Sequence, residues 1–223
     1  MDVSEAITSR RSIRGFLDKP VDGQTIRRVL QTAARAASGG NLQPWLIHVV
    51  GGQNLAALKA IMAQRVLTGP GGEPSDYKIY PDNLWTPYRE RRYKVGEDLY
   101  ATLSIPREDK AGRQRQFARN FQFFGAPLAL FCYVDRGMGP PQWSDLGMFL
   151  QNVMILLRGE GLDSCAQECW SVYPKTVSQF LGTTEQHMLF CGMAIGYADP
   201  NEPANKLVTQ RAALDEFATF RGI

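Results

Sequence analysis

Apolar residues recur along the chain at two spacings, three to four positions in some segments and two in others. Between residues 23 and 37 they recur every three or four positions after a suitable N-cap, Asp22, which predicts an amphipathic helix. Short apolar runs between turn-forming residues predict strands. The predicted helices cover 3–9, 23–37, 52–67, 88–104, 107–124, 143–160 and 174–181. The predicted strands cover 45–50, 128–134, 163–167 and 188–197.

The predicted helix 143–160 is the most apolar of these segments. One stripe of it consists of Leu146, Phe149, Leu150, Val153, Met154 and Leu157. Met148, Ile155 and Leu156 extend the apolar surface around most of the helix. A helix that is apolar on nearly all sides must be covered on nearly all sides. We therefore expect either a central helix or a helix at a subunit interface.

The chain shows no internal repeat and no low-complexity linker, so we expect a single domain over residues 1–223. Residues 68–87 contain four Pro and three Gly, which predicts an irregular segment. The tail from Pro200 has few apolar positions before Phe217 and Phe220, and a tail of this kind often docks on a partner chain.

The composition is that of an ordinary globular protein, with 44% hydrophobic and 21% charged residues. The net charge of +3 gives no reason to expect a nucleic-acid partner. No apolar run reaches the ~18–20 residues of a membrane span, and the N-terminus lacks the pattern of a signal peptide, so we expect a cytoplasmic protein. Two His and four Cys residues show no metal-ligand spacing, and no metal site is expected.

Positive charge is concentrated in the first half of the chain, where residues 1–120 contain 19 basic and 12 acidic side chains. Three guanidinium groups and a hydroxyl lie within the segment Arg10–Arg14, whose sequence is RRSIR. Arginine binds phosphate oxygens bidentately and serine adds a donor, so this segment is a candidate anion site. The same pattern is also typical of a solvated basic turn.

Two further segments could hold a planar ligand. In ASGGNLQPW, residues 37–45, small residues are followed by amide side chains, which offer the donor and the acceptor that a heterocycle edge requires. In LDSCAQECW, residues 162–170, a strand with small residues can present backbone N–H and C=O groups to such a ligand. Alone, the first pattern is also typical of a loop that ends a helix, and the second of a core strand.

Aromatic and basic residues alternate between Trp85 and Tyr100. Arg89, Arg91 and Arg92 lie within this stretch and suit a cofactor 2′-phosphate, a substrate carboxylate or neither. Aromatic residues at helical spacing are also typical of a hydrophobic core. The candidate substrate residues are Tyr88, Arg89, Arg92, Tyr100 and Phe124.

The order and spacing of these motifs resemble the nitroreductase family of FMN-dependent flavoenzymes. RRSIR near residue 10 is followed by ASGGNLQPW, by GLDSCAQ after the apolar helix, and by GMAIGYADPNEPANK and Arg211. The resemblance covers essentially the whole chain. The segments WTPYRERR and NFQFFGAPLAL are similar to the branch that includes nitrobenzoate and nitroaromatic reductases.

The resemblance implies an α+β fold, a mostly antiparallel central sheet flanked by helices, in an intertwined homodimer. It implies that residues 68–125 form a helical excursion over the active site and that residues 200–223 form a tail embracing the partner subunit. From the charge and the lack of long apolar runs, we expect no nucleic-acid partner and no membrane partner.

The resemblance also implies a set of FMN-binding residues. Residues 10–12 match positions that hold the phosphate and ribityl chain, Arg14 matches the basic residue near the flavin N1/C2=O edge, and the segment 38–43 is supplied by the other subunit. Gly39–Gly40 stand where many relatives carry Ser or Thr, which removes a hydroxyl donor there. The implied residues are Arg10, Arg11, Ser12, Arg14, Ser38, Gly39, Asn41, Gln43, Ala166, Gln167, Glu168, Lys206 and Arg211.

The implied activity is that of an FMN-dependent NAD(P)H nitroreductase. NADH or NADPH donates electrons through the flavin in a ping-pong sequence, and a nitroaromatic compound such as a nitrobenzoate is reduced to nitroso and hydroxylamine products. The flavin N5 carries the chemistry, so no catalytic side chain is expected and Arg14 tunes the flavin. The same fold reduces enones, quinones or halogenated aromatics in other branches, and a flavin-binding redox protein with low turnover is a further alternative.

Overall fold

A four-stranded sheet forms the centre of the computed structural model, which describes residues 1–68 and 72–223. The strands are β1 (Leu46–Gly51), β2 (Leu128–Asp135), β3 (Asp163–Gln167) and β4 (His187–Gly196). The α-helices are α1 (Val3–Ser9), α2 (Gly23–Ala33), α3 (Gly52–Thr68), α4 (Tyr88–Thr102), α5 (Lys110–Ala118), α6 (Pro140–Gly159) and α7 (Pro174–Leu181). Short 3-10 helices are η1 (Gly39–Asn41), η2 (Arg119–Gly125), η3 (Glu168–Val172), η4 (Pro203–Lys206) and η5 (Leu214–Glu216).

All strand pairs of the sheet are antiparallel, in the order β1-β2-β4-β3. Leu46 lies opposite Tyr133, and Leu128 lies opposite Ile195. The register between β2 and β4 shifts at Cys132, which marks an irregularity of the bulge type. The expectation of an antiparallel sheet flanked by helices is confirmed.

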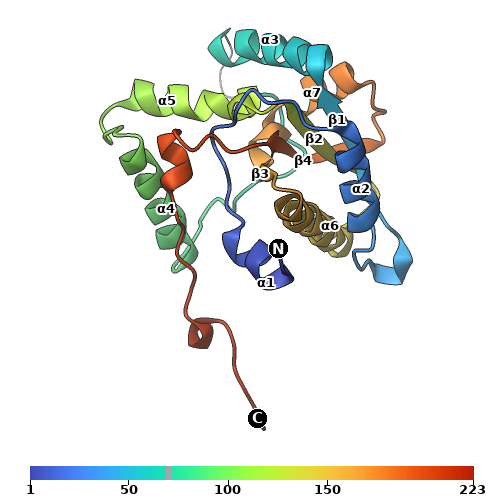
Figure 1. Cartoon of the computed structure of the whole chain (residues 1–223), viewed down its shortest axis with the longest axis vertical. Helices are drawn as coiled ribbons and strands as arrows, with labels where there is room; N and C mark the ends of the chain where they lie inside the picture. Colours follow the sequence, from blue (N-terminus) through green and yellow to red (C-terminus); the bar gives the residue numbers. More distant parts are fainter. Residues whose placement is uncertain (69–71) are drawn as a thin grey trace.

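Side chains of β2 alternate between two hydrophobic cores, as the period of a strand requires. Phe131 and Tyr133 lie in a core with α3, α7 and η2, whereas Leu130 and Val134 lie in a second core with α2 and α6. All four side chains are completely buried. Figure 1 shows the corresponding layers, with α3 and α7 over one face of the sheet and α2 and α6 over the other.

Helix α6 contains the apolar segment predicted over 143–160, and its central stripe is buried from Leu146 to Leu157. The apolar side chains outside this stripe are less covered, since Met148 is 42% exposed and Ile155 and Leu156 are half-buried. One flank of α6 is therefore open on its own chain. None of the described helices, α6 included, is long and apolar enough to cross a lipid bilayer.

Helix α2 is shorter than the predicted helix 23–37. Asp22 caps its N-terminus as expected and accepts the N–H groups of Gln24 and Thr25. The helix ends at Ala33, where the N–H group of Ala36 bonds three residues back to the Ala33 carbonyl and tightens the last turn. Residues 33–37 are rich in alanine and contain no glycine or proline that would end a helix, so the apolar pattern predicted a helix that was too long.

The predicted helix 107–124 is divided in two. Helix α5 ends at Ala118 and the 3-10 helix η2 follows. Within η2, Phe123 and Phe124 adopt left-handed φ angles of 50° and 53° that a regular helix does not allow. This turn directs the Phe124 carbonyl toward the N–H group of Phe16, which it accepts at 3.2 Å.

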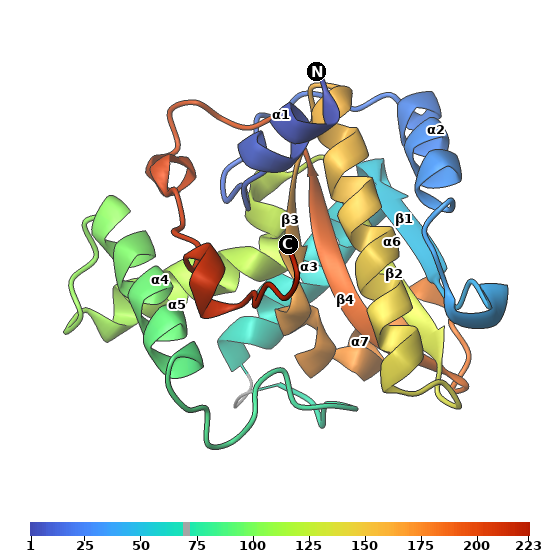
Figure 2. The ribbon, with the colours of Figure 1, turned by 90° about the horizontal axis from the view of Figure 1, so that it is seen from below.

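Helices α4 and α5 lie together beside the sheet, next to the C-terminal tail (Figure 2). The irregular segment predicted over 68–87 has neither helix nor strand from residue 72 to residue 87. Residues 69–71 of this segment, and of the predicted excursion 68–125, lie outside the described residues.

The substitution Gly192→Ala is expected to lower the free energy of unfolding by about 1–3 kcal/mol, because a Cβ at Gly192 would overlap the completely buried Trp170. Gly96→Ala in α4 is the matched control, since nothing lies within 4 Å of the added methyl group, and it should raise stability by about 0.5–1 kcal/mol. Urea denaturation measures both. Equal stability of Gly192→Ala and the wild type would contradict the packing of β4 on Trp170.

Candidate functional site

The segment Arg10–Arg14 runs in extended conformation along β3 at the edge of the sheet. Ser12 forms a parallel bridge with Ser164, and the Ile13 N–H group donates to the Ser164 carbonyl at 3.0 Å. Ile13 is buried in the core. Because side chains alternate along an extended chain, Ser12 and Arg14 point away from that core.

Helix α1 fixes the point at which this segment begins. Asp2 caps the helix by accepting the Glu5 N–H group at 2.8 Å. At the other end, Arg158 of α6 donates from Nε to the Ser9 hydroxyl at 3.3 Å and forms an ion pair with Asp163 at 2.6 Å. The arginine segment therefore starts from a helix end that is tied to α6 and β3.

Arginine cations gather at this segment. Burial and the nearby Arg211 guanidinium lower the pKa of Arg10 below its usual value. Burial raises the pKa of the neighbouring Cys165 thiol, and the charges of Arg14 and Arg10 oppose this increase. Within residues 1–68 and 72–223, neither these three arginines nor Arg11 forms an ion pair with a carboxylate. Such a cluster is suited to hold an external anion.

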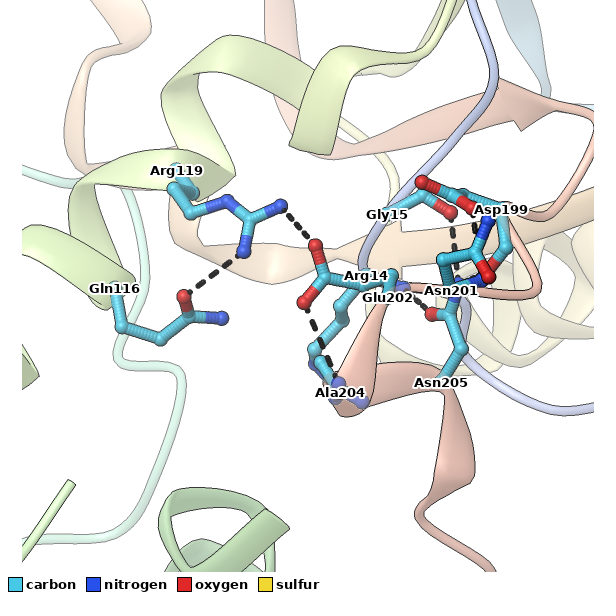
Figure 3. Close-up of polar contacts among 9 residues, drawn as sticks. All are labelled: Arg14, Gly15, Gln116, Arg119, Asp199, Asn201, Glu202, Ala204 and Asn205. Carbon is cyan, nitrogen blue, oxygen red and sulfur yellow. Dashed lines mark hydrogen bonds and ion pairs between the residues drawn. The ribbon is translucent and has the colours of Figure 1, made fainter. Parts of the chain in front are cut away.

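Asn205 connects the arginine segment to the C-terminal tail (Figure 3). Its Oδ1 accepts the backbone N–H of Arg14 at 2.7 Å. Its Nδ2 donates to the carbonyl oxygens of Gly15 at 2.8 Å and Asp199 at 2.9 Å. The backbone carbonyl of Asn205 also accepts from Arg11 Nη1 at 3.4 Å. Asn205 of η4 thus bonds both to the arginine segment and to Asp199, which lie far apart in the sequence.

Glu202 makes the second polar contact of the tail, also drawn in Figure 3. Its carboxylate pairs with Arg119 Nη2 at 2.7 Å and accepts the Ala204 N–H group at 3.4 Å. Arg119 in turn donates from Nη1 to Gln116 Oε1 at 3.2 Å. A Cβ at Gly15 would overlap the Glu202 side chain, so the close approach of tail and arginine segment requires glycine there.

The end of β3 follows directly after the residues that face the arginines. Ala166 and Glu168 are exposed, whereas Gln167 is buried and donates from Nε2 to the Asn120 carbonyl at 2.8 Å. The Gln167 side chain is therefore engaged in the protein interior. A ligand at this strand end would meet the backbone of Gln167 and not its amide.

The loop that contains Ser38, Gly39, Asn41 and Gln43 lies on the far side of α6 from the arginine segment, as Figures 1 and 2 show. Asn41 and Gln43 adopt left-handed φ angles of 57° and 51°, and Ser38 Oγ accepts the Gln43 N–H group at 3.1 Å. The Gly39 N–H group donates to the Asp145 carboxylate at 3.3 Å. The structure does not bring this loop to the arginines of the same chain.

Three candidate substrate residues lie on the exposed first turns of α4. Tyr88 is 50% exposed. Arg89 pairs with Glu90 at 3.2 Å, and the Arg92 guanidinium lies over the Tyr80 ring, 4.0 Å from its centre. Aromatic faces and guanidinium groups are therefore accessible together at this end of the helix.

The other two candidate substrate residues lie elsewhere. Tyr100 is twelve positions beyond Tyr88, about 18 Å along the helix axis, and its ring lies under the Arg113 guanidinium at 4.2 Å. Phe124 is 3% exposed and belongs to the hydrophobic core.

A groove of about 250 Å³ separates α4 from the tail. Arg91, Lys94 and Arg211 contribute its cations, and the Arg91–Glu216 ion pair at 2.9 Å spans it. Lys206, which precedes the groove along the tail, is exposed. The groove therefore adjoins the same Arg211 that lies near Arg10.

The family model described as "Nitroreductase family" matches residues 7–197. The chain belongs to the nitroreductase family. This nitroreductase is 36% identical to the 4-nitrobenzoate reductase of Pseudomonas putida over 99% of this chain and 96% of that protein. It is 34% identical to the nitrobenzene nitroreductase of Ectopseudomonas oleovorans over 98% of this chain and 96% of that protein.

Solved structures agree with this membership. The FMN and NADPH-dependent nitroreductase NfnB from sphigopyxis sp. strain HMH superimposes on the whole chain with a TM-score of 0.97, 48% identity and complete coverage of both chains. The FMN-dependent NfnB from Mycobacterium smegmatis, in complex with NADPH, has a TM-score of 0.93 and 29% identity over 98% of this chain and 97% of that chain.

Sequence reasoning did not single out Glu202, Asn205 or Arg119 of this nitroreductase. The first two lie in the motif GMAIGYADPNEPANK, whose Asp, Asn and Pro residues signal turns with side-chain to backbone hydrogen bonds. Arg119 carried no distinguishing signal, because its partner Glu202 is 83 residues away in the sequence.

Inorganic phosphate is expected to raise the Tm of the ligand-free nitroreductase, because it neutralises the repulsion between Arg10 and Arg211. At ten times its Kd it stabilises the fold by about 1.4 kcal/mol, which corresponds to about 3–5 °C for a chain of this size. Differential scanning fluorimetry at constant ionic strength measures the shift. Arg211→Gln should reduce it, whereas the exposed Arg27→Gln in α2 should not. Equal shifts in both variants would contradict an anion site at Arg211.

Proposed function

We propose that this protein is an FMN-dependent NAD(P)H oxidoreductase that reduces nitroaromatic compounds. The observation that carries the proposal is the group of arginines at Arg10, Arg14 and Arg211, which have no carboxylate partner among the described residues. The superposition on a solved nitroreductase named as FMN- and NADPH-dependent supports the choice of cofactor and electron donor.

The donor set fits the phosphate of FMN. A phosphate monoester carries about −1.5 to −2 charge at pH 7, and arginine forks match its oxygens. Burial and the charge of Arg211 lower the pKa of Arg10, and a dianion bound between Arg10 and Arg211 would offset both effects. Arg11 and Ser12 on the same segment, and the exposed Lys206, supply further donors.

The end of β3 fits a planar ring. Ala166, Gln167 and Glu168 would offer their backbone groups to the flavin, and Arg14 would lie at its N1/C2=O edge. When bound, FMN accepts two electrons from NAD(P)H and passes them to the nitro group. Arg14 contributes a fixed positive charge where negative charge accumulates, and we assign no nucleophile or general base to the chain.

The exposed start of α4 is the proposed substrate contact. Tyr88 offers an aromatic face to an electron-poor ring, and Arg89 and Arg92 offer cations to a carboxylate of the nitrobenzoate type. Relatives named as 4-nitrobenzoate reductase and nitrobenzene nitroreductase support this substrate class. Tyr100, near the C-terminal end of α4, and Phe124, in the hydrophobic core, would help to shape the segment 68–125.

We also propose that two chains form the functional unit. Several apolar side chains of the tail are 56–71% exposed on their own chain, namely Val208, Leu214, Phe217 and Phe220. Exposed apolar groups of this extent are typical of a surface that another molecule covers. The loop 38–43, which lies far from the arginines of its own chain, would contribute Ser38, Gly39, Asn41 and Gln43 to the site of the second chain.

The purified protein is expected to bind FMN, with an absorbance band near ~450 nm, and to reduce 4-nitrobenzoate or nitrobenzene with NADH or NADPH. Steady-state turnover with both nicotinamides measures this, with an enone and a halogenated phenol as the comparison substrates. A colourless protein that FMN does not reconstitute would overturn the proposal. Turnover of the enone or the halogenated phenol alone would move the function to another branch of the family.

The substitution Phe217→Asp is expected to shift the protein from a dimer toward a monomer, because it places a charge on the apolar surface of the tail. Size-exclusion chromatography with light scattering measures the mass. Ala60→Asp, which adds the same charge at an exposed position of α3, should leave the dimer intact. A wild-type protein that is monomeric at micromolar concentration would contradict the proposed assembly.

A further inference from the structure

We propose that Asn205 is a positioning residue that sets the place of Arg14 in the cofactor site, an inference that rests on the proposed function. The site consists of two segments, one around Arg14 and one that leads to Arg211. Asn205 belongs to the segment that leads to Arg211, and its side chain bonds to the segment around Arg14 (Figure 3). Its role is therefore to keep the two segments in one geometry.

The amide of Asn205 uses both of its ends in these contacts. Oδ1 accepts the Arg14 N–H group, and Nδ2 donates to the carbonyl oxygens of Gly15 and Asp199. The Gly15 carbonyl also accepts the Asp199 N–H group at 3.0 Å, so the amide closes a ring of hydrogen bonds around this crossing. A carboxamide carries a donor NH2 group and an acceptor oxygen on the same side chain, so Asn205 can make both kinds of contact here.

The position of the Arg14 side chain follows from this backbone anchor. Arg14 Nη1 donates to the Ser12 carbonyl at 3.2 Å, and no carboxylate within the described part of the chain pairs with the guanidinium. A cation held by neutral contacts keeps its full charge for a ligand, whereas an acidic partner would neutralise it. Asn205 thus fixes Arg14 without lowering its electrostatic effect on the flavin edge.

The tail is well placed to act as a rigid support for this amide. Ala204 is 1% exposed, and Glu202 caps the start of η4 while it pairs with Arg119. Because Glu202 also lies against Gly15, the tail contacts the arginine segment through packing as well as through Asn205. Removal of the Asn205 amide should therefore loosen Arg14 while the tail remains docked.

A double-mutant cycle tests this role through the Kd of FMN, measured by titration of the apoprotein with fluorescence detection. Asn205→Ala should weaken binding about fivefold in the wild-type background, because the hydrogen bond from the Arg14 N–H group is lost together with those to Gly15 and Asp199. In the Arg14→Ala background the same change should weaken binding less than twofold, since the residue through which Asn205 acts is gone. The midpoint potential of bound FMN should become more negative in Asn205→Ala.

The control is Asn201→Ala, in the same tail, because the exposed Asn201 contributes its backbone N–H group to Asp199. It should change neither the Kd nor the potential. Asn205→Gln, which keeps an amide but displaces it by one methylene, carries the same test if Asn205→Ala does not fold, as judged by the Tm of the apoprotein.

Equal Kd values for Asn205→Ala and Asn201→Ala would overturn the inference, as would a fivefold effect that persists in the Arg14→Ala background. The latter result would give Asn205 a purely structural role. If the wild-type chain itself binds no FMN, the proposed function fails and this inference fails with it. The wild-type titration therefore distinguishes the two failures.

Discussion

Repulsion between like charges is the constraint on which this site depends. Burial and the charge of Arg211 both act against the Arg10 cation, and within residues 1–68 and 72–223 neither arginine pairs with a carboxylate, so the fold must hold the two guanidinium groups in place against that cost. Neutral contacts do this. Ile13 and Phe16 anchor the arginine segment in the hydrophobic core, and Asn205 bonds the segment to the tail. The sheet, the tail and the core can therefore all be understood as the support of one group of cations.

Elements specified by local periodicity were predictable from the sequence. The strand 163–167 and the helix 174–181 have the predicted bounds, since their apolar patterns and turn residues lie within the elements themselves. The prediction of a regular helix up to residue 124 was wrong, because the backbone turns at Phe124 and its carbonyl accepts a hydrogen bond from Phe16, more than one hundred residues earlier in the chain. A contact of that range leaves no trace in local spacing.

The contacts of the candidate site divide in the same way into local and distant ones. The motif RRSIR is contiguous and visible in the sequence, and the structure places its Ser12 beside Ser164 of β3. The bond between Asn205 and Arg14 spans 191 residues, and no local pattern specifies it. The loop 38–43 presents a further limit, because the structure of one chain leaves it apart from the arginines, and its proposed place in a site requires a second chain. The proposed substrate contact at the start of α4 is a similar case, since the Arg92–Tyr80 contact joins a helix to a segment without regular structure.

The order of the strands has a consequence for how the protein is made. Strand β4 lies between β2 and β3, although it follows both in the sequence, and the residues that meet Arg14 come later still. At about 5–20 residues per second, the ribosome adds Asn205 roughly 10–40 s after Arg14. During that interval the arginine segment has neither its sheet neighbour in final register nor its tail. Assembly of the site around Arg14 must therefore follow the synthesis of nearly all of this sequence. A chain stalled before β4 would expose both hydrophobic faces of an unfinished sheet to chaperones and proteases.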